Sequence, residues 1–237
     1  MEIKKDLQSD SNLIPEAIGK NMYNLGIKYG NDKITHHRYD LIYPNFLSQL
    51  NNKKIKMLEI GLGDSSGGTG FSRNMWKEFF PDSIIYVMDI NNEFEDEIGL
   101  VIKGDQSILE DLKKVGDLFG KLDLIIDDGS HHPEHQIKSF NHFFHENLKN
   151  GGLYIIEDIE CSYWNPIECI YGYETGYLNI IDYFSKLLHG INSEFSREEN
   201  KYNISQITFA KNCIMIKKQT EEEIELNRRE YRFKDLL

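Results

Sequence analysis

Short apolar runs alternate with amphipathic stretches along most of the chain, and this pattern predicts parallel strands joined by helices. Five of the runs are nearly all apolar, as expected for strands buried on both faces. They cover residues 55–60, 83–88, 99–102, 122–126 and 153–156. Helices are expected over about residues 71–80 and 133–148, and a turn over residues 149–152 should close the second helix.

The two ends of the chain depart from this alternation. Runs over residues 204–209 and 213–216 flank a connection too short for a parallel crossover, so the pair is predicted to be an antiparallel hairpin. The first 50 residues read as mostly helical, with a polar interruption, KYGNDKITHHRY. We therefore predict an α/β fold: a helical N-terminal segment over residues 1–50, then one domain over residues 51–237. That domain should be a doubly wound, mostly parallel, seven-stranded, Rossmann-like sheet that ends in the hairpin.

Composition and charge narrow the class of protein. The 237 residues are 40% hydrophobic and 28% charged, which is typical of one water-soluble globular domain. The formal net charge of −12 disfavours a nucleic-acid partner, and no apolar run is long enough to span a membrane. The first ten residues do not resemble a secretory signal, and Cys161, Cys169 and Cys213 form no close pair. We therefore expect a cytoplasmic protein without disulfides.

Acidic or amide side chains stand at the end of every predicted parallel strand. They are Glu59, Asp89, Asp105, Gln106, Asp127, Asp128, Glu157 and Asp158. Ligands of an open α/β sheet bind outside the carboxyl ends of its strands. One acidic residue at a strand end is unremarkable because strand ends meet water, but five such ends in succession indicate a ligand site.

A glycine-rich loop follows the first predicted strand and precedes a helix. Gly61, Gly63, Gly67 and Gly68 would let the backbone approach a ligand closely, although a glycine pair alone could also be a tight turn. Asp89, at the end of the next strand, could accept hydrogen bonds from both ribose hydroxyls of an adenosine cofactor. This combination fits NAD and S-adenosylmethionine equally. The antiparallel hairpin separates them, since nicotinamide-binding sheets are usually wholly parallel and an antiparallel last strand resembles the class I methyltransferase fold.

Four segments between about residues 54 and 164 carry a more specific resemblance. They read MLEIGLGDSSGG, GDQS, LIIDDGSHH and GGLYIIEDIECSYW. Together they resemble the metal-dependent sugar O-methyltransferases that act on macrolide antibiotics, which have relatives in surface-polysaccharide biosynthesis. KYGNDKITHHRY also looks like a segment that precedes this core in such proteins. The resemblance implies S-adenosyl-L-methionine and Mg²⁺ (or another divalent cation) as cofactors. It implies a sugar hydroxyl of a polysaccharide precursor or glycosylated metabolite as the acceptor.

The same resemblance implies a role for individual residues at the ends of the fourth and fifth strands. It makes Asp128, Glu157 and Asp158 the metal ligands and His131 the general base. A physical argument agrees, because three converging carboxylates repel one another unless a hard cation that prefers oxygen ligands lies between them. Two alternatives stay open: His132 or His135 as the base, and His131-His132-Pro133 as a plain helix entry.

The remaining strand-end residues are assigned to the methyl donor. Glu59, Gly61, Gly63 and Asp89 belong to the glycine-loop side of this cofactor site. Asp105 and Gln106 would lie by the adenine. Asp127 either orients its loop or faces the methionine end of the cofactor.

Other readings of the chain differ in substrate or in class. The aromatic residues Tyr163, Trp164, Tyr171, Tyr173 and Tyr177 could stack on sugar rings. Such clusters are more often core packing or a homo-oligomer interface. A catechol or phenol O-methyltransferase and a non-catalytic S-adenosylmethionine-binding protein are the alternatives. An NAD oxidoreductase is disfavoured by the hairpin and the metal carboxylates.

Overall fold

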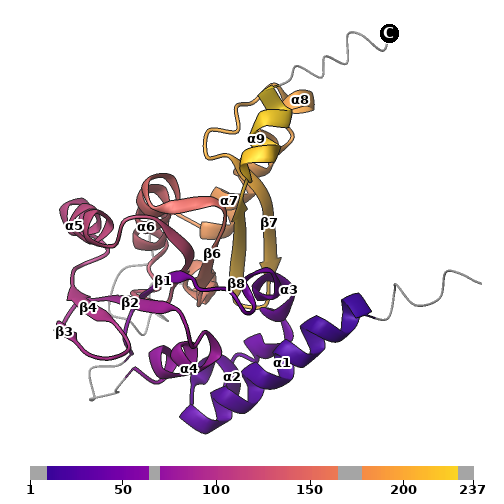
Figure 1. The fold of residues 1–237 in the computed structure, drawn as a ribbon. Helices are drawn as coiled ribbons and strands as arrows, with labels where there is room; N and C mark the ends of the chain where they lie inside the picture. Colours follow the sequence, from indigo (N-terminus) through magenta and orange to yellow (C-terminus); the bar gives the residue numbers. More distant parts are fainter. Residues whose placement is uncertain (1–9, 64–69, 165–177, 229–237) are drawn as a thin grey trace, which may run out of the picture. The chain divides into compact units, whose positions relative to one another are not determined.

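The computed structural model describes residues 10–63, 70–164 and 178–228 (Figure 1). The chain divides into two compact units, residues 1–103 and 104–237, which are described in turn. The boundary expected after residue 50 stays a prediction. Within the described ranges, no helix combines the length and the apolar character that a membrane crossing requires.

The first unit contains a mostly parallel group of strands. They are β1 (Lys56–Ile60), β2 (Ile84–Asp89), β3 (Phe94–Glu95) and β4 (Leu100–Lys103), in the order β3-β4-β2-β1. β2 pairs in parallel with β1 and β4, as predicted, whereas β3 runs antiparallel to β4. β3 was not among the predicted strands, because two residues are too few to show a periodicity.

Helices make up most of the first 50 residues, as expected. They are α1 (Asp10–Tyr29), α2 (Asp32–Thr35), η1 (Tyr39–Leu41), α3 (Pro44–Leu47) and η2 (Ser48–Leu50), and α4 (Phe71–Phe79) follows β1. The polar interruption folds into α2 and η1. The rings of Tyr39 and Tyr43 stack 5.0 Å apart, and the Tyr43 ring stacks on Trp76 of α4 at 6.5 Å. These fully buried aromatic rings pack the N-terminal helices against α4.

The second unit carries the remaining strands and the antiparallel hairpin. Its elements are α5 (Leu109–Phe119), β5 (Leu122–Asp127), α6 (Pro133–Glu146), β6 (Leu148–Glu157), η3 (Ile159–Tyr163), α7 (Ile180–Ile191), α8 (Ser193–Ser196), β7 (Ile204–Ala210), β8 (Cys213–Lys218) and α9 (Glu221–Arg228). The strand order is β5-β6-β8-β7. β5 and β6 pair in parallel, whereas β8 runs antiparallel to both β6 and β7. The predicted hairpin, formed by β7 and β8, is therefore confirmed (Figure 1).

The turn expected over residues 149–152 is wrong. These residues belong to β6, which begins at Leu148, and the register with β5 shifts between Leu122 and Leu124. Gly151 has a φ of 76° and lies within this irregular stretch. Glycine there permits a bulge inside a strand, where its sequence signal resembles that of a turn.

Lys218, the last residue of β8, holds the C-terminal end of α6. Its buried ammonium group donates hydrogen bonds to the carbonyl oxygens of Phe144 (2.7 Å), His145 (3.3 Å) and Leu148 (2.9 Å). The last carbonyls of a helix have no partner within the helix, and a cation there also complements the helix dipole. The hairpin thereby fixes the helix whose N-terminal end follows the DDGSHH segment.

We predict that Lys218→Met destabilises the protein by about 2–4 kcal/mol, because two or three buried carbonyl groups lose their donor. Chemical denaturation of wild type and variant measures this difference. Lys211→Met provides the matched control, since Lys211 is an exposed lysine in the same hairpin. Equal stability losses in the two variants would contradict the prediction.

Candidate metal centre and cofactor-binding residues

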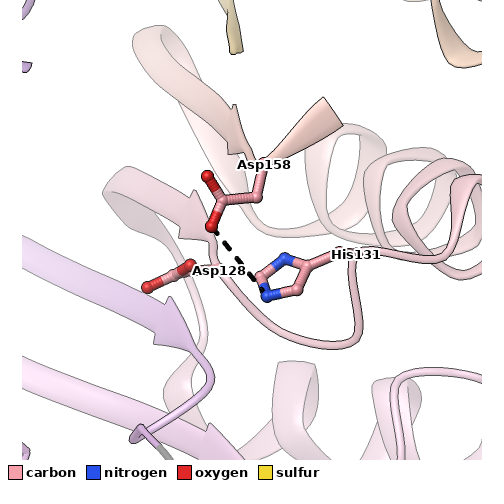
Figure 2. A group of neighbouring side chains, drawn as sticks. All are labelled: Asp128, His131 and Asp158. Atoms are coloured by element: carbon pink, nitrogen blue, oxygen red, sulfur yellow. Dashed lines mark ion pairs between the residues drawn. The ribbon is translucent and has the colours of Figure 1, made fainter. Parts of the chain in front are cut away.

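Three of the predicted site residues converge beyond the carboxyl ends of β5 and β6. Asp128 follows β5, Asp158 follows β6, and His131 lies in the loop that leads into α6. The parallel register of β5 and β6, which pairs Asp127 with Ile156, brings both strand ends to one edge of the sheet. One potential ligand atom from each of the three side chains lies within 4.8 Å of the others (Figure 2).

The chemistry of this group suits a divalent cation. His131 Nε2 is 4.0 Å from Asp158 Oδ2, and the two side chains are only 14% and 11% exposed. Two carboxylates held this close together repel each other, more strongly when water is largely excluded. A hard cation prefers oxygen ligands and removes that repulsion, and an imidazole nitrogen can complete its coordination or act beside it. The donor set therefore fits Mg²⁺ or a similar ion.

The backbone at this group is held in an unfavourable conformation. His131 has a φ of 58° and Asp158 has φ 52° and ψ 56°, so both lie in the left-handed region that favours glycine. Such conformations cost about 1–3 kcal/mol each and cluster at functional sites, where the surrounding structure enforces them. The backbone conformations that orient the side chains of His131 and Asp158 are therefore not those of lowest local energy.

Glu157, the third predicted metal ligand, is not part of this group. Its side chain is buried, and it pairs with Cys213 across β6 and β8. Burial, together with the negative charges of Glu157 and Asp158, raises the pKa of the Cys213 thiol to about 12, so both carboxylates lie near that sulfur. The role of Glu157 as a metal ligand stays a prediction.

Gln106 holds the loop that carries Asp128 and His131. Its amide nitrogen donates to Asp127 (3.1 Å) and to Ser139 Oγ (3.1 Å), and its amide oxygen accepts from the Ser130 backbone N–H (2.6 Å). Both ends of the side chain are therefore engaged within the protein. The contact of Gln106 with adenine stays a prediction. Its hydrogen bonds to Asp127, Ser139 and Ser130 are a structural role that the sequence did not indicate.

Asp127 lies fully buried beneath the same loop. Besides the amide of Gln106, the Tyr154 hydroxyl donates to it at 3.4 Å, and burial raises the pKa of Asp127 to about 7. These contacts agree with the alternative in which Asp127 orients its loop. Its assignment to the cofactor stays a prediction.

The other two histidines of the DDGSHHPEH segment have different environments from His131. His132 is the N-cap of α6, where its Nδ1 accepts from the Glu134 N–H (3.2 Å), so in the neutral ring the proton is on Nε2. His135 Nδ1 is 3.0 Å from Ser130 Oγ, and burial lowers its pKa. Pro133 is the first residue of α6. The helix-entry reading is therefore right for residues 132 and 133, and His131 precedes that entry.

Glu59 in the first unit has structural partners. Its carboxylate accepts hydrogen bonds from Ser72 Oγ (2.9 Å) and Trp76 Nε1 (3.2 Å) and forms an ion pair with Lys33 Nζ (3.4 Å). The side chains of Lys33 and Glu59 are 1% and 0% exposed. The assignment of Glu59 to the cofactor stays a prediction. Nothing in the polar segment that contains Lys33 signals this pairing in the sequence.

The start of the glycine loop and Asp89 are linked in the first unit. Gly61 and Gly63 have φ values of 96° and 115°. Asp89 Oδ2 accepts from the Leu62 N–H (3.1 Å), and Oδ1 accepts from the N–H groups of residues 91 and 92 (2.9 and 2.8 Å). The carboxylate predicted to bind ribose thereby also holds the backbone of Leu62 at the start of the loop.

The structure describes only some of the other candidate residues. Asp105 is half-buried, and its carboxylate accepts from the Ser107 N–H at 2.8 Å. Tyr163 is 70% exposed in η3, and Trp164 follows it. The predicted cofactor contact of Asp105 and the sugar stacking of Tyr163 stay predictions. Five further candidates lie outside the described residues: Gly67, Gly68, Tyr171, Tyr173 and Tyr177.

Comparison with solved structures decides the fold. The chain superposes on the MycE methyltransferase from the mycinamycin biosynthetic pathway, in complex with Mg and SAH, with a TM-score of 0.75 and 27% sequence identity. The match covers 86% of this chain and 55% of MycE. This chain has the class I methyltransferase fold. A second MycE structure, which also contains mycinamycin VI, gives the same TM-score of 0.75.

Curated proteins give relatives of this methyltransferase fold. The chain is 31% identical over 172 residues to 8-demethyl-8-alpha-L-rhamnosyl tetracenomycin-C 2'-O-methyltransferase of Streptomyces olivaceus, covering 70% of the chain and 44% of the relative. It is 36% identical over 144 residues to mycinamicin VI 2''-O-methyltransferase of Micromonospora griseorubida, covering 56% of the chain and 36% of the relative. The chain thus spans less than half the length of these relatives. No protein-family model matches it.

These findings confirm the resemblance that the motifs predicted. The relatives are named as sugar O-methyltransferases of macrolide and tetracenomycin pathways. The expected relatives in surface-polysaccharide biosynthesis stay a prediction.

The buried Lys33–Glu59 pair yields a test of its structural role. We predict that Lys33→Met and Glu59→Gln each destabilise the protein by about 3–5 kcal/mol, because each removes one charge of a buried ion pair and leaves the other charge buried without it, and that the double variant loses less than the sum. Chemical denaturation of the four proteins measures this coupling. Lys28→Met is the control, since the Lys28–Glu78 pair is exposed and should contribute much less. Strictly additive losses would contradict the pairing.

Proposed function

We propose that this chain transfers a methyl group from S-adenosylmethionine to a sugar hydroxyl of a glycosylated natural product, with a divalent cation at the site. The observation that carries the proposal is the convergence of Asp128, His131 and Asp158 at the sheet edge of a class I methyltransferase fold. The names of the relatives support a sugar acceptor over a catechol or phenol. The structure of MycE was obtained with Mg, SAH and mycinamycin VI, which supports the same pair of cofactors. A cytoplasmic location, as expected from the sequence, belongs to this proposal.

The residues divide into two sets in the proposed enzyme. Asp128 and Asp158 hold the cation, with Glu157 as the further ligand implied by the sequence resemblance. Gly61, Gly63 and Asp89 contact the methyl donor. A bound cation would neutralise the carboxylates and make a nearby hydroxyl more acidic, and S-adenosylmethionine would supply an activated methyl group.

His131 acts as the general base. Its imidazole takes the proton of the acceptor hydroxyl, and the acceptor oxygen then forms a bond to the methyl carbon as the methyl–sulfur bond breaks. The electron pair of the broken bond stays on sulfur. The carboxylate of Asp158 is 4.0 Å from His131 Nε2, so the imidazole lies beside the proposed cation site. The left-handed backbone of His131 aims the ring toward the two carboxylates.

We predict that methyl transfer depends on a divalent metal and on Asp158. Wild type stripped with EDTA should lose activity and regain it with Mg²⁺. Asp158→Ala should abolish turnover while retaining affinity for S-adenosylhomocysteine. The assay follows transfer from radiolabelled S-adenosylmethionine to rhamnosylated and other deoxysugar-bearing polyketides, with calorimetry for cofactor affinity. Full activity after exhaustive metal removal would refute the metal centre, and absence of binding to either sulfur compound would refute the methyltransferase itself.

We also predict that His131→Ala lowers kcat by about 10²–10⁴-fold, the usual contribution of a general base, while cofactor affinity is retained. His145→Ala is the matched control, because His145 is an exposed histidine in the last turn of α6. His135→Ala tests the alternative base. If His131→Ala stays within about threefold of wild type, well below that range, His131 is not the base.

A further inference from the structure

Asn212 connects the C-terminal hairpin with the candidate metal centre. Lys211 and Asn212 alone join β7 to β8, and Asn212 has a left-handed backbone with a φ of 58°. Its side-chain nitrogen donates to Asp158 Oδ1 at 2.8 Å, and its side-chain oxygen accepts from the Glu160 N–H at 3.0 Å. Both ends of this amide therefore bond to the segment that carries Asp158.

The antiparallel register explains why the hairpin turn reaches this position. Glu157, the last residue of β6, pairs with Cys213, the first residue of β8. The residue after β6 and the residue before β8 are therefore neighbours, and these are Asp158 and Asn212. A parallel last strand would run in the opposite direction and would not bring its preceding turn to this end of β6.

The contact fixes which oxygen of Asp158 faces the centre. Oδ1 accepts from Asn212, whereas Oδ2 is the oxygen that lies 4.0 Å from His131 Nε2. The orientation of the Asn212 amide is itself determined, because a carboxylate requires the NH₂ end and a backbone N–H requires the oxygen end. The plane of the Asp158 carboxylate is thus held at Oδ1 by a neutral donor.

We propose that Asn212 is a positioning residue that orients Asp158 for metal binding. The proposal rests on the proposed function, in which Asp158 holds a divalent cation. Hydrogen-bond partners of metal ligands typically change metal affinity by about 10–100-fold, because they fix the orientation of the ligand before the metal binds. A turn needs only a residue that tolerates a positive φ, so the side-chain amide of Asn212 is a feature that the turn itself does not demand.

Asn212→Gly tests this role, because glycine keeps the left-handed backbone and removes only the amide. The matched control is Asn203→Gly. Asn203 is an exposed asparagine with a φ of 53° in the same unit, and it precedes β7. Mn²⁺, which prefers similar oxygen ligands to Mg²⁺, serves as the probe, and its affinity for the cofactor-free protein is measured by electron paramagnetic resonance of the unbound ion. Thermal unfolding and calorimetry with S-adenosylhomocysteine report on the fold.

We expect Asn212→Gly to bind Mn²⁺ about 10–100-fold more weakly than wild type, with unchanged affinity for S-adenosylhomocysteine, and Asn203→Gly to match wild type. If Asn212→Gly does not unfold cooperatively, Asn212→Ser replaces it, with a shorter hydroxyl in place of the amide. Variant affinity within about threefold of wild type would overturn the role of Asn212 alone, as would an equal loss in Asn203→Gly. A wild type that binds no Mn²⁺ would overturn the metal centre of the proposed function, and the role of Asn212 with it.

Discussion

Repulsion between the carboxylates of Asp128 and Asp158 is the constraint around which the second unit is organised. Two parallel strands bring these side chains to one edge, and their potential ligand atoms lie within 4.8 Å of each other and of His131. Water screens such charges poorly where the side chains are largely buried. The fold must therefore hold the carboxylates together through other contacts, and it supplies those contacts from several elements.

Those contacts come from opposite sides of the centre. The Gln106 amide bonds both to the backbone N–H of Ser130 and to the carboxylate of Asp127, so it holds the loop after β5. Asn212, in the hairpin turn, donates a hydrogen bond to Asp158.

Lys218 binds the C-terminal end of α6, while His132 caps its N-terminal end directly after His131. Neutral amides contact Asp127 and Asp158, and the buried lysine lies at the far end of the helix.

The strands, the hairpin and the site segments depend on local sequence pattern and could be predicted from it. Apolar runs located the parallel strands, and the short connection after Ala210 required an antiparallel pair. The DDGSHH and EDIE segments predicted a site at Asp128, His131 and Asp158, and the structure brings these three residues together.

Other features depended on distant partners and could not be predicted from one sequence. Lys33 lies in a polar segment with no sign that it pairs with Glu59, and Asn212 reads as an ordinary turn residue. The glycines of the misassigned turn at 149–152 gave a signal that a bulge shares.

The left-handed backbone at residues 131 and 158 has an evolutionary consequence. Glycine adopts this conformation at less cost than histidine or aspartate, and a neutral residue at position 158 would also relieve the repulsion between the two carboxylates. Substitutions that destroy the proposed chemistry could therefore make the folded chain more stable. A descendant released from selection for methyl transfer should drift toward such residues at these two positions first, while Glu59 and Lys33, whose loss would destabilise the fold, persist.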